Sequence, residues 1–168
     1  MRKIIIKKNR HYPIPLAPFS LPIWVNKYNY TVISHDFNFT DSCMFDLVDA
    51  DQHDVNKLFG FSIGYHHKTS FRFGWRPILK NNDIQIVAYE YQEGVRLPTM
   101  IIDEVKLNEW HNFNIKYSPI QESTTYTFNG NTFTNEVNIE KKYGLGYTLG
   151  VFFGGNEKAP HDITIYMK

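Results

Sequence analysis

The stretch that decides the fold is Gly144 to Lys168, which reads GLGYTLGVFFGGNEKAPHDITIYMK. It contains two short apolar segments joined by a loop of glycine, proline and polar residues, a pattern typical of two strands and a connecting turn. From Asp162 onward apolar and polar side chains alternate, so Ile163 and Ile165 share one face. We therefore expect two buried strands here, with the final residues inside a sheet.

The composition favours one β-rich domain. The chain has 168 residues, 42% of them apolar, with 13 Phe and 11 Tyr. This length is enough for a substantial core, and aromatic residues are enriched in strands. The single cysteine, Cys43, excludes an internal disulfide and is interpreted as a small buried hydrophobe.

The first residues do not form a recognisable export signal. Residues 1–8 read MRKIIIKK, and the apolar run Ile4 to Ile6 is much shorter than the about 7 to 15 apolar residues of a secretion signal. No apolar run approaches the about 18 residues of a membrane-spanning helix. We expect a soluble protein without a membrane partner.

Residues 1–30 are predicted to form a basic, proline-rich extended arm, and residues 31–168 the folded domain. Four prolines fall between Pro13 and Pro22, which disfavours a helix or a central strand. Residues 1–35 hold six basic residues and no acid. We expect the arm to bind a neighbouring chain, and the alternative is a strap across its own domain. The predicted partner-binding residues are Arg2, Lys3, Lys7, Lys8, Arg10, Phe19 and Trp24.

From residue 31 the pattern predicts about a dozen short strands. Lys57 to Tyr65 and Thr69 to Arg76 flank a tight turn, which indicates a β-hairpin, and Asn129-Gly130 is a second hairpin signal. Such a density of short strands predicts an all-β fold: a two-sheet antiparallel β-sandwich, or jelly roll.

One strand makes a sharp prediction about its two faces. Phe71, Phe73 and Trp75 alternate with Arg72 and Arg76. We expect the aromatic face to lie in the core and the two arginines to lie on the other face, where at least one guanidinium binds a carboxylate or backbone carbonyls.

Three segments carry a family resemblance. They are KLFGFSIGYHHKTSFRFGWR at 57–76, IVAYEYQEGVR at 86–96 and FGGNEKAPHDI at 153–163. Together they resemble an uncharacterised family of concanavalin A-like jelly-roll proteins of Bacteroides-type bacteria and their crAss-like tailed phages. The resemblance covers roughly residues 50–168. It implies a sandwich fold and, in phages, a place in the virion with other virion proteins or further copies of the chain as partners.

The last strand is also similar to that of laminarinase-type glucanases and related carbohydrate-binding modules, in which an Asp near its start helps to hold a structural calcium. The resemblance places Asp162 in that position. The alternative is that Asp162 caps a loop by accepting backbone N–H bonds. No other cofactor is expected.

The sequence offers few residue groups suited to catalysis or metal binding. Glycoside hydrolysis needs two carboxylates across a cleft, yet Glu90 stands alone and Asp103 and Glu104 point to opposite faces. His66 and His67 are adjacent in a turn without a third ligand, so zinc is not expected. The acidic loop with Asp49, Asp51 and Asp54 lacks the EF-hand spacing and glycine, and we interpret it as solvated. His53 in this loop and His161, which precedes Asp162, are interpreted as exposed or hydrogen-bonded.

The leading hypothesis is therefore a non-enzymatic structural or accessory protein of a phage virion, assembled in the host cytoplasm and docked through its arm. The alternative is a carbohydrate-binding module, and the alternative location is the bacterial cytoplasm. The third is a polysaccharide lyase, with Tyr or His as the base and Arg on the uronate. Nucleic acid is not expected, because residues 36–168 are net acidic. The candidate ligand-binding residues are Arg72, Trp75, Arg76, Tyr89, Tyr91, Trp110, His111 and Phe153.

Overall fold

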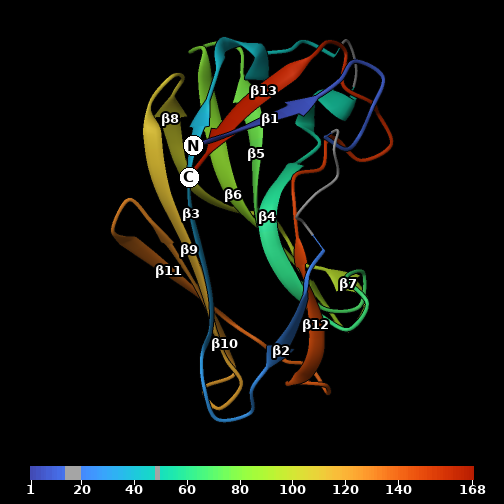
Figure 1. The fold of residues 1–168 in the computed structure, drawn as a ribbon, viewed down its shortest axis with the longest axis vertical. Coiled ribbons are helices and arrows are strands. Elements are labelled where there is room, and N and C mark those ends of the chain that lie inside the picture. The colour runs from blue at the N-terminus through green and yellow to red at the C-terminus, as the bar shows by residue number, and fades with distance from the viewer. Residues whose placement is uncertain (14–19, 48–49) are drawn as a thin grey trace.

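The computed structural model describes residues 1–13, 20–47 and 50–168, and within them the fold is a two-layer antiparallel β-sandwich (Figure 1). The regular elements of these described residues are thirteen strands and two single turns of 3-10 helix, Asp41–Cys43 and Ala50–His53. No helix in this part of the chain is long and apolar enough to cross a membrane. The predicted all-β jelly-roll sandwich is confirmed.

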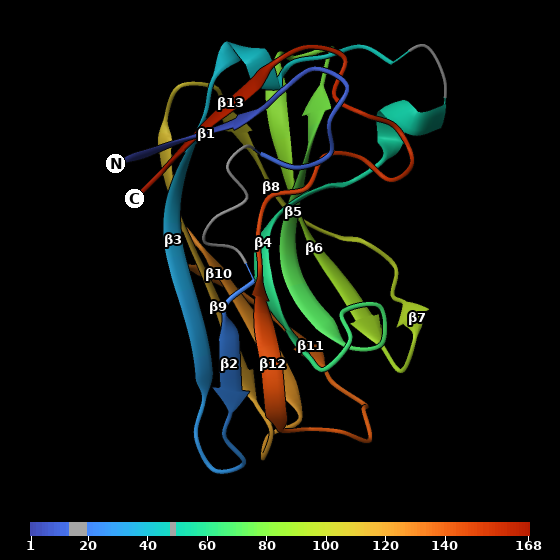
Figure 2. The same ribbon diagram turned by 45° about the vertical axis from the view of Figure 1, so that its right-hand side comes forward.

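Each layer is a sheet of antiparallel neighbours. The six-stranded sheet has the order β1 (Arg2–Ile6), β13 (Ile163–Met167), β3 (Thr31–Phe39), β9 (Trp110–Ser118), β10 (Ser123–Phe128) and β11 (Asn131–Glu136). The seven-stranded sheet has the order β2 (Pro22–Val25), β12 (Gly144–Leu149), β4 (Asn56–Ile63), β5 (Ser70–Ile78), β6 (Asp83–Gln92) and β7 (Val95–Arg96), with β8 (Met100–Lys106) also paired to β6. Figure 2 shows β2, β12, β4, β5 and β6 of this sheet side by side.

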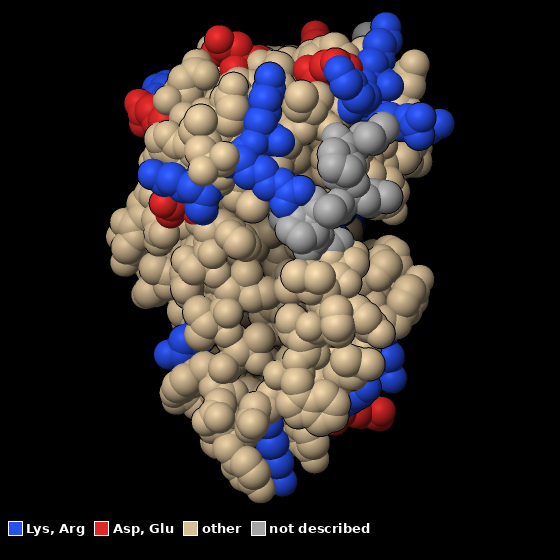
Figure 3. Space-filling model, in the orientation of Figure 1, with Lys and Arg blue, Asp and Glu red and all other residues tan. Residues whose placement is uncertain are grey.

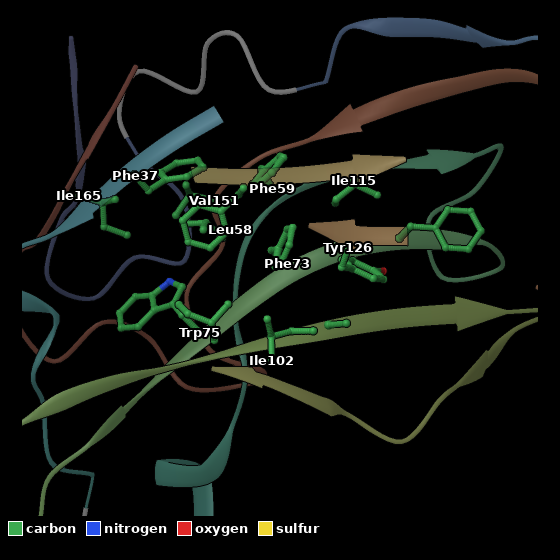
Figure 4. Packing of buried hydrophobic residues seen from close by; sticks show 14 of the residues in the cluster. Phe37, Leu58, Phe59, Phe73, Trp75, Ile102, Ile115, Tyr126, Val151 and Ile165 are labelled. Atoms are coloured by element: carbon green, nitrogen blue, oxygen red, sulfur yellow. The ribbon is translucent and has the colours of Figure 1, made fainter. Parts of the chain in front are cut away.

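Aromatic rings fill the space between the sheets (Figure 4). Phe73 of β5 packs edge-on against Phe113 of β9 and Tyr126 of β10, with ring centroids 5.0 Å apart in both pairs. Phe59 of β4 lies 5.4 Å from Phe37 of β3. Rings from alternate positions of facing strands therefore interdigitate, as the strand periodicity requires.

The two predicted faces of β5 are confirmed. Phe71, Phe73 and Trp75 are fully buried in the core. Arg72 and Arg76 lie on the outer face, and both guanidiniums bind backbone carbonyls: Arg72 Nη2 donates to the Gly150 oxygen at 2.6 Å and Arg76 Nη1 to the His53 oxygen at 3.1 Å.

The segment predicted as an arm contributes a strand to each sheet. β1 pairs with β13 over five residues and buries Ile4 and Ile6, while β2 pairs with β12 and buries Val25. The extended arm thus pairs with both sheets, and β1 and β2 are edge strands, where prolines such as Pro22 are tolerated. The alternative of a strap across the same domain describes this arrangement.

Most of the basic residues of this segment lie at the surface, and Lys7 forms an ion pair there. Lys7 Nζ donates to Asp162 at 2.7 Å, and the backbone N–H of Arg10 donates to the Lys7 oxygen. Trp24 is 71% exposed on β2. In Figure 3 Lys and Arg gather in the upper half of the visible face, and the lower half carries little charge. Phe19 lies outside the described residues.

Candidate ligand-binding cleft

A cleft of about 560 Å³ lies on the outer face of the seven-stranded sheet. Strand alternation points Lys57 of β4, Arg72 of β5, and Tyr89 and Tyr91 of β6 away from the core and into it. The remaining lining comes from the turn between β4 and β5, the end of β12 and the segment after it, and the N-terminal segment: Tyr12, Pro13, Ser20, His66, His67, Ser70, Leu149, Gly150, Val151, Phe152 and Gly155.

Small residues beneath the cleft make room for it. In the strand register Gly60 of β4 lies opposite Arg72, which lies opposite Tyr89. Two residues further along β4, Ser62 lies opposite Ser70 of β5. A Cβ on Gly60 would lie 2.0 Å from the Phe71 oxygen and 2.9 Å from Arg72 Cγ. The absence of a side chain at position 60 therefore leaves the space over β4 to Arg72.

Arg72 is a buried cation that has no carboxylate partner among the described residues. It is only 9% exposed, and it forms none of the ion pairs found within the described ranges. Nη2 donates to the Gly150 oxygen, but buried Nε has no hydrogen-bond partner in the described part of the chain. Burial lowers the pKa of Arg72 to about 10, and Tyr89 and Tyr12 oppose this shift. The guanidinium is still charged at neutral pH.

Lys57 brings a second positive charge to the cleft. Its Nζ donates to the Gly154 oxygen at 2.7 Å and lies 5.0 Å from the ring centre of Tyr89 and 5.4 Å from that of Phe152. Burial, with a contribution from the charge of Arg72, lowers the pKa of Lys57 to about 8, and Asp54 acts in the opposite direction. The ammonium form thus dominates at neutral pH but is lost on mild alkalinisation.

Aromatic and imidazole rings surround the two cations. The rings of His66 and His67 lie 4.3 Å apart, and His67 contacts the edge of Tyr91 at 5.3 Å. Burial raises the pKa of Tyr89, as does its hydrogen bond with Tyr91, and burial lowers the pKa of His66. At neutral pH the tyrosine hydroxyl therefore keeps its proton, and His66 is predominantly neutral.

The structure brings together only part of the predicted ligand-binding set. Arg72, Tyr89 and Tyr91 line the cleft. Arg76 lies on the same sheet face but outside the cleft, where its Nε donates to Gln85 Oε1 at 2.8 Å. The prediction of Trp75 as a ligand-binding residue is corrected, because it points from β5 into the core and is 0% exposed.

Three further candidates lie elsewhere. Phe153 is 1% exposed and packs on Phe45 in the core, so its predicted contact with a ligand is corrected as well. Trp110 and His111 belong to β9 of the other sheet, where Lys168 Nζ lies over the Trp110 ring at 4.6 Å and His111 is buried beside Phe128. The predicted grouping of His111 with the arginines and tyrosines is thus corrected, because its strand is in the opposite layer.

The sequence did carry a signal for the residues that were missed. Gly60 and Ser62 alternate with buried Phe59 and Phe61 in β4 and mark an outward face next to that of Arg72. A β-bulge between Lys57 and Phe59 interrupts this alternation, so the pattern alone does not place Lys57 on that face. His66 and His67 were interpreted only as turn residues, although a turn at the end of this hairpin lies at the rim of the same face.

Asp162, the residue predicted for calcium, has two protein donors. Its oxygens accept from Lys7 Nζ at 2.7 Å and from the Lys8 N–H at 2.9 Å, which is the loop-capping alternative. These hydrogen bonds lower the pKa of Asp162. No group of three or more His, Cys, Asp or Glu residues within the described ranges is placed to hold a metal ion. Asp49 and the side chain of Asp51 lie outside the part described; Asp54 accepts from the Gly155 N–H at 3.1 Å.

The sequence matches no protein-family model and no curated protein, but its fold resembles solved structures. An alginate lyase from Pseudomonas aeruginosa has a TM-score of 0.54 at 8% identity, over 84% of this chain and 65% of the lyase. A family 7 alginate lyase, A1-II′, in complex with its product has a TM-score of 0.58 at 9% identity, over 86% and 62%.

A toad ovary galectin in complex with thio-digalactose also matches, over 90% of this chain and 100% of the galectin, with a TM-score of 0.47 and 12% identity. The chain spans 61% to 65% of the length of the alginate lyases that it matches. At these identities the likeness to the lyases establishes the fold alone. The class of protein so defined is a jelly-roll sandwich with a cationic, ring-lined cleft on one sheet.

Proposed function

We propose that the protein binds a carbohydrate in the cleft on its seven-stranded sheet. The observation that carries this proposal is one concave site in which tyrosine rings stand beside buried hydrogen-bond donors, in a volume of about 560 Å³. Small-molecule sites are typically apolar clefts of roughly 300 to 1,000 Å³ with a few well-placed polar groups. A sugar offers both an apolar ring face and many hydroxyls, so it suits this lining.

Structures with a similar fold support the same class of ligand. The alginate lyase A1-II′ has been solved with its product and, in another structure, with its substrate. A shared fold does not transfer a function by itself, so the proposal depends on the residues of this cleft. Tyr89 and Tyr91 supply ring faces and hydroxyls, and Lys57 and Arg72 supply donors.

Calorimetric titration with neutral and acidic oligosaccharides tests the proposal. We expect binding by the native protein, and Tyr91→Ala is expected to weaken it roughly threefold to tenfold by removing one ring contact. Trp110→Ala is the matched control, because Trp110 is an exposed aromatic residue on the other sheet. Equal weakening by both variants, or no saccharide binding at all, would contradict the proposal.

A polysaccharide lyase is the second candidate, favoured by the presence of Arg72, Tyr89 and His66 in one cleft. In such an elimination a base removes the proton next to the carboxylate, a double bond forms, the glycosidic C–O bond breaks and the leaving oxygen takes up a proton. Tyr89 keeps its proton because its pKa is raised, so neutral His66 is the better proton acceptor. Unsaturated products that disappear with His66→Ala would establish this second function.

The expectation of a place in a phage particle stays a prediction that depends on the family resemblance of residues 50–168. Nearby portal and capsid genes would support it, whereas nearby polysaccharide-utilisation genes would favour a glycan function without a particle. The cleft proposal is compatible with either setting, since particle proteins can also bind glycans.

A further inference from the structure

We infer that the cleft selects an anionic saccharide, whose carboxylate or sulfate group is held between the guanidinium of Arg72 and the ammonium of Lys57. This inference rests on the proposed function and makes it more specific. In this inference Arg72 donates hydrogen bonds to the anionic group from a fixed position. Lys57 provides a second positive charge, which can be lost by titration. The sugar rings then contact Tyr89 and Tyr91.

The first support is the incomplete environment of Arg72. Burying an unpaired charge is costly, and buried guanidiniums are normally paired with carboxylates. Arg72 instead has one carbonyl, that of Gly150, on Nη2, and its buried Nε has no partner in the described part of the chain. A guanidinium presents its donors in a rigid fork that matches two oxygens of a carboxylate or sulfate. An anion in the cleft would give this guanidinium the charged partner that it lacks among the described residues.

The second support is the excess of positive charge in the cleft. The charge of Arg72 is one of the influences that lower the pKa of Lys57, so the two cations lie close enough to repel. Arg96 acts on Lys57 in the same direction, and Asp54 is the acid that opposes them. No carboxylate of the described residues lines the cleft. An anionic ligand would relieve this repulsion.

The nearest acid on β6 is unavailable to either cation. Glu90 lies between Tyr89 and Tyr91 in sequence, but strand alternation turns it to the core side, where Tyr126 Oη donates to its Oε1 at 2.8 Å. Asp54 is held by the Gly155 N–H at 3.1 Å. Among the described residues Asp54 only partly offsets the positive charge of Lys57, and an anionic ligand would supply further counter-charge.

The inference has a pH signature. The pKa of Lys57 is about 8 in the free protein, and an adjacent anion would raise it, so binding takes up a proton at pH values above 8. We expect affinity for an acidic saccharide to fall by about tenfold per pH unit at most as the pH rises beyond 8. Tyr89 and Arg72 do not titrate below about pH 9, since their pKa values are raised and about 10 respectively. His66 titrates on the acidic side because its pKa is lowered.

The experiment compares matched ligands at pH 7.0 and 9.0: an oligouronate, its neutral methyl ester, a sulfated oligosaccharide and inorganic sulfate. We expect the oligouronate or the sulfated oligosaccharide to bind at least about tenfold more tightly than the ester, since hydrogen bonds to charged groups are the strong ones. Arg72→Met should remove this preference. Arg76→Met is the matched control, because Arg76 shares the sheet face but lies outside the cleft.

A second variant keeps the test valid if Arg72→Met does not fold. Lys57→Met preserves most of the apolar stem and is expected to abolish the loss of affinity between pH 7.0 and 9.0. Equal binding of the ester and the acid would overturn the inference and leave the proposed function standing. Binding of inorganic sulfate without any saccharide would support the anion site and overturn the carbohydrate proposal. Binding of none of the four ligands would overturn both.

Discussion

Arg72 and Gly60 face one another across the β4–β5 ladder, and the space that Gly60 leaves empty is where the arginine side chain begins. This pairing explains how a charged side chain can lie flat over the sheet and reach the carbonyl of Gly150 beyond β4. The cleft therefore depends on a position that contributes no side chain of its own.

Gly60→Ala is expected to destabilise the protein by about 1 to 3 kcal/mol, the usual cost of overpacking. The new Cβ would meet the Phe71 oxygen at 2.0 Å and the Cα of Arg72 at 2.7 Å. Denaturant unfolding measures the effect. Ser62→Ala is the control on the same face of β4, because the buried Ser62 hydroxyl has no partner among the described residues and its loss should be nearly neutral. An unchanged midpoint for Gly60→Ala would show that the strands separate easily here.

The N-terminal strand is expected to be part of the folding unit. Ile6 is 1% exposed in the core, so Ile6→Ala should lower the free energy of unfolding by about 2 to 5 kcal/mol. Lys3→Ala, at an exposed position of the same strand, should change it by less than about 0.5 kcal/mol. If Ile6→Ala unfolds at the same denaturant concentration as the native protein, β1 would be an independent arm after all.

Glu90 predicts a pH dependence of stability. Burial raises its pKa, so the folded protein keeps this proton at pH values where the unfolded chain has lost it. The free energy of unfolding should therefore fall as the pH rises from about 4.3, the ordinary pKa of glutamate, toward the raised pKa. Glu90→Gln should reduce this slope, whereas Glu109→Gln, at an exposed site, should leave it unchanged. Equal slopes in all three proteins would contradict the assignment.

Asp162 is expected to act without calcium, because its carboxylate already accepts from Lys7 Nζ and the Lys8 N–H. Melting temperatures measured with added Ca²⁺ and with a chelator should therefore agree. A rise in the melting temperature with Ca²⁺ that is lost in Asp162→Ala would instead establish the structural calcium that the resemblance implies.

The alternation of side chains carried most of the fold prediction. Both faces of β5 are predictable because side chains in a strand alternate with a period of two. Phe71, Phe73 and Trp75 lie on one face and Arg72 and Arg76 on the other. The same rule also placed Trp75 in the core, which conflicts with its other predicted role at a ligand. The aromatic content that suggested a sugar platform is mostly core packing.

The candidate site was only partly predictable, because it depends on pairing between strands. Nothing local in the sequence states that Gly60 lies opposite Arg72, or that His111 lies on the other sheet. The N-terminal strands are hard to predict for a related reason. The partner of β1 is β13, at the other end of the sequence, so the residues near β1 give no hairpin pattern.

The pairing of Arg2 with Met167 also has a consequence for biosynthesis. The first strand leaves the ribosome long before its ladder partner exists, so its apolar run must wait in solution while the rest of the chain is made. The basic residues on both sides of Ile4 to Ile6 resemble the gatekeeper charges that keep waiting strands from associating with other chains. Charges that flank an apolar strand in this way would oppose its association with other chains before β13 is made.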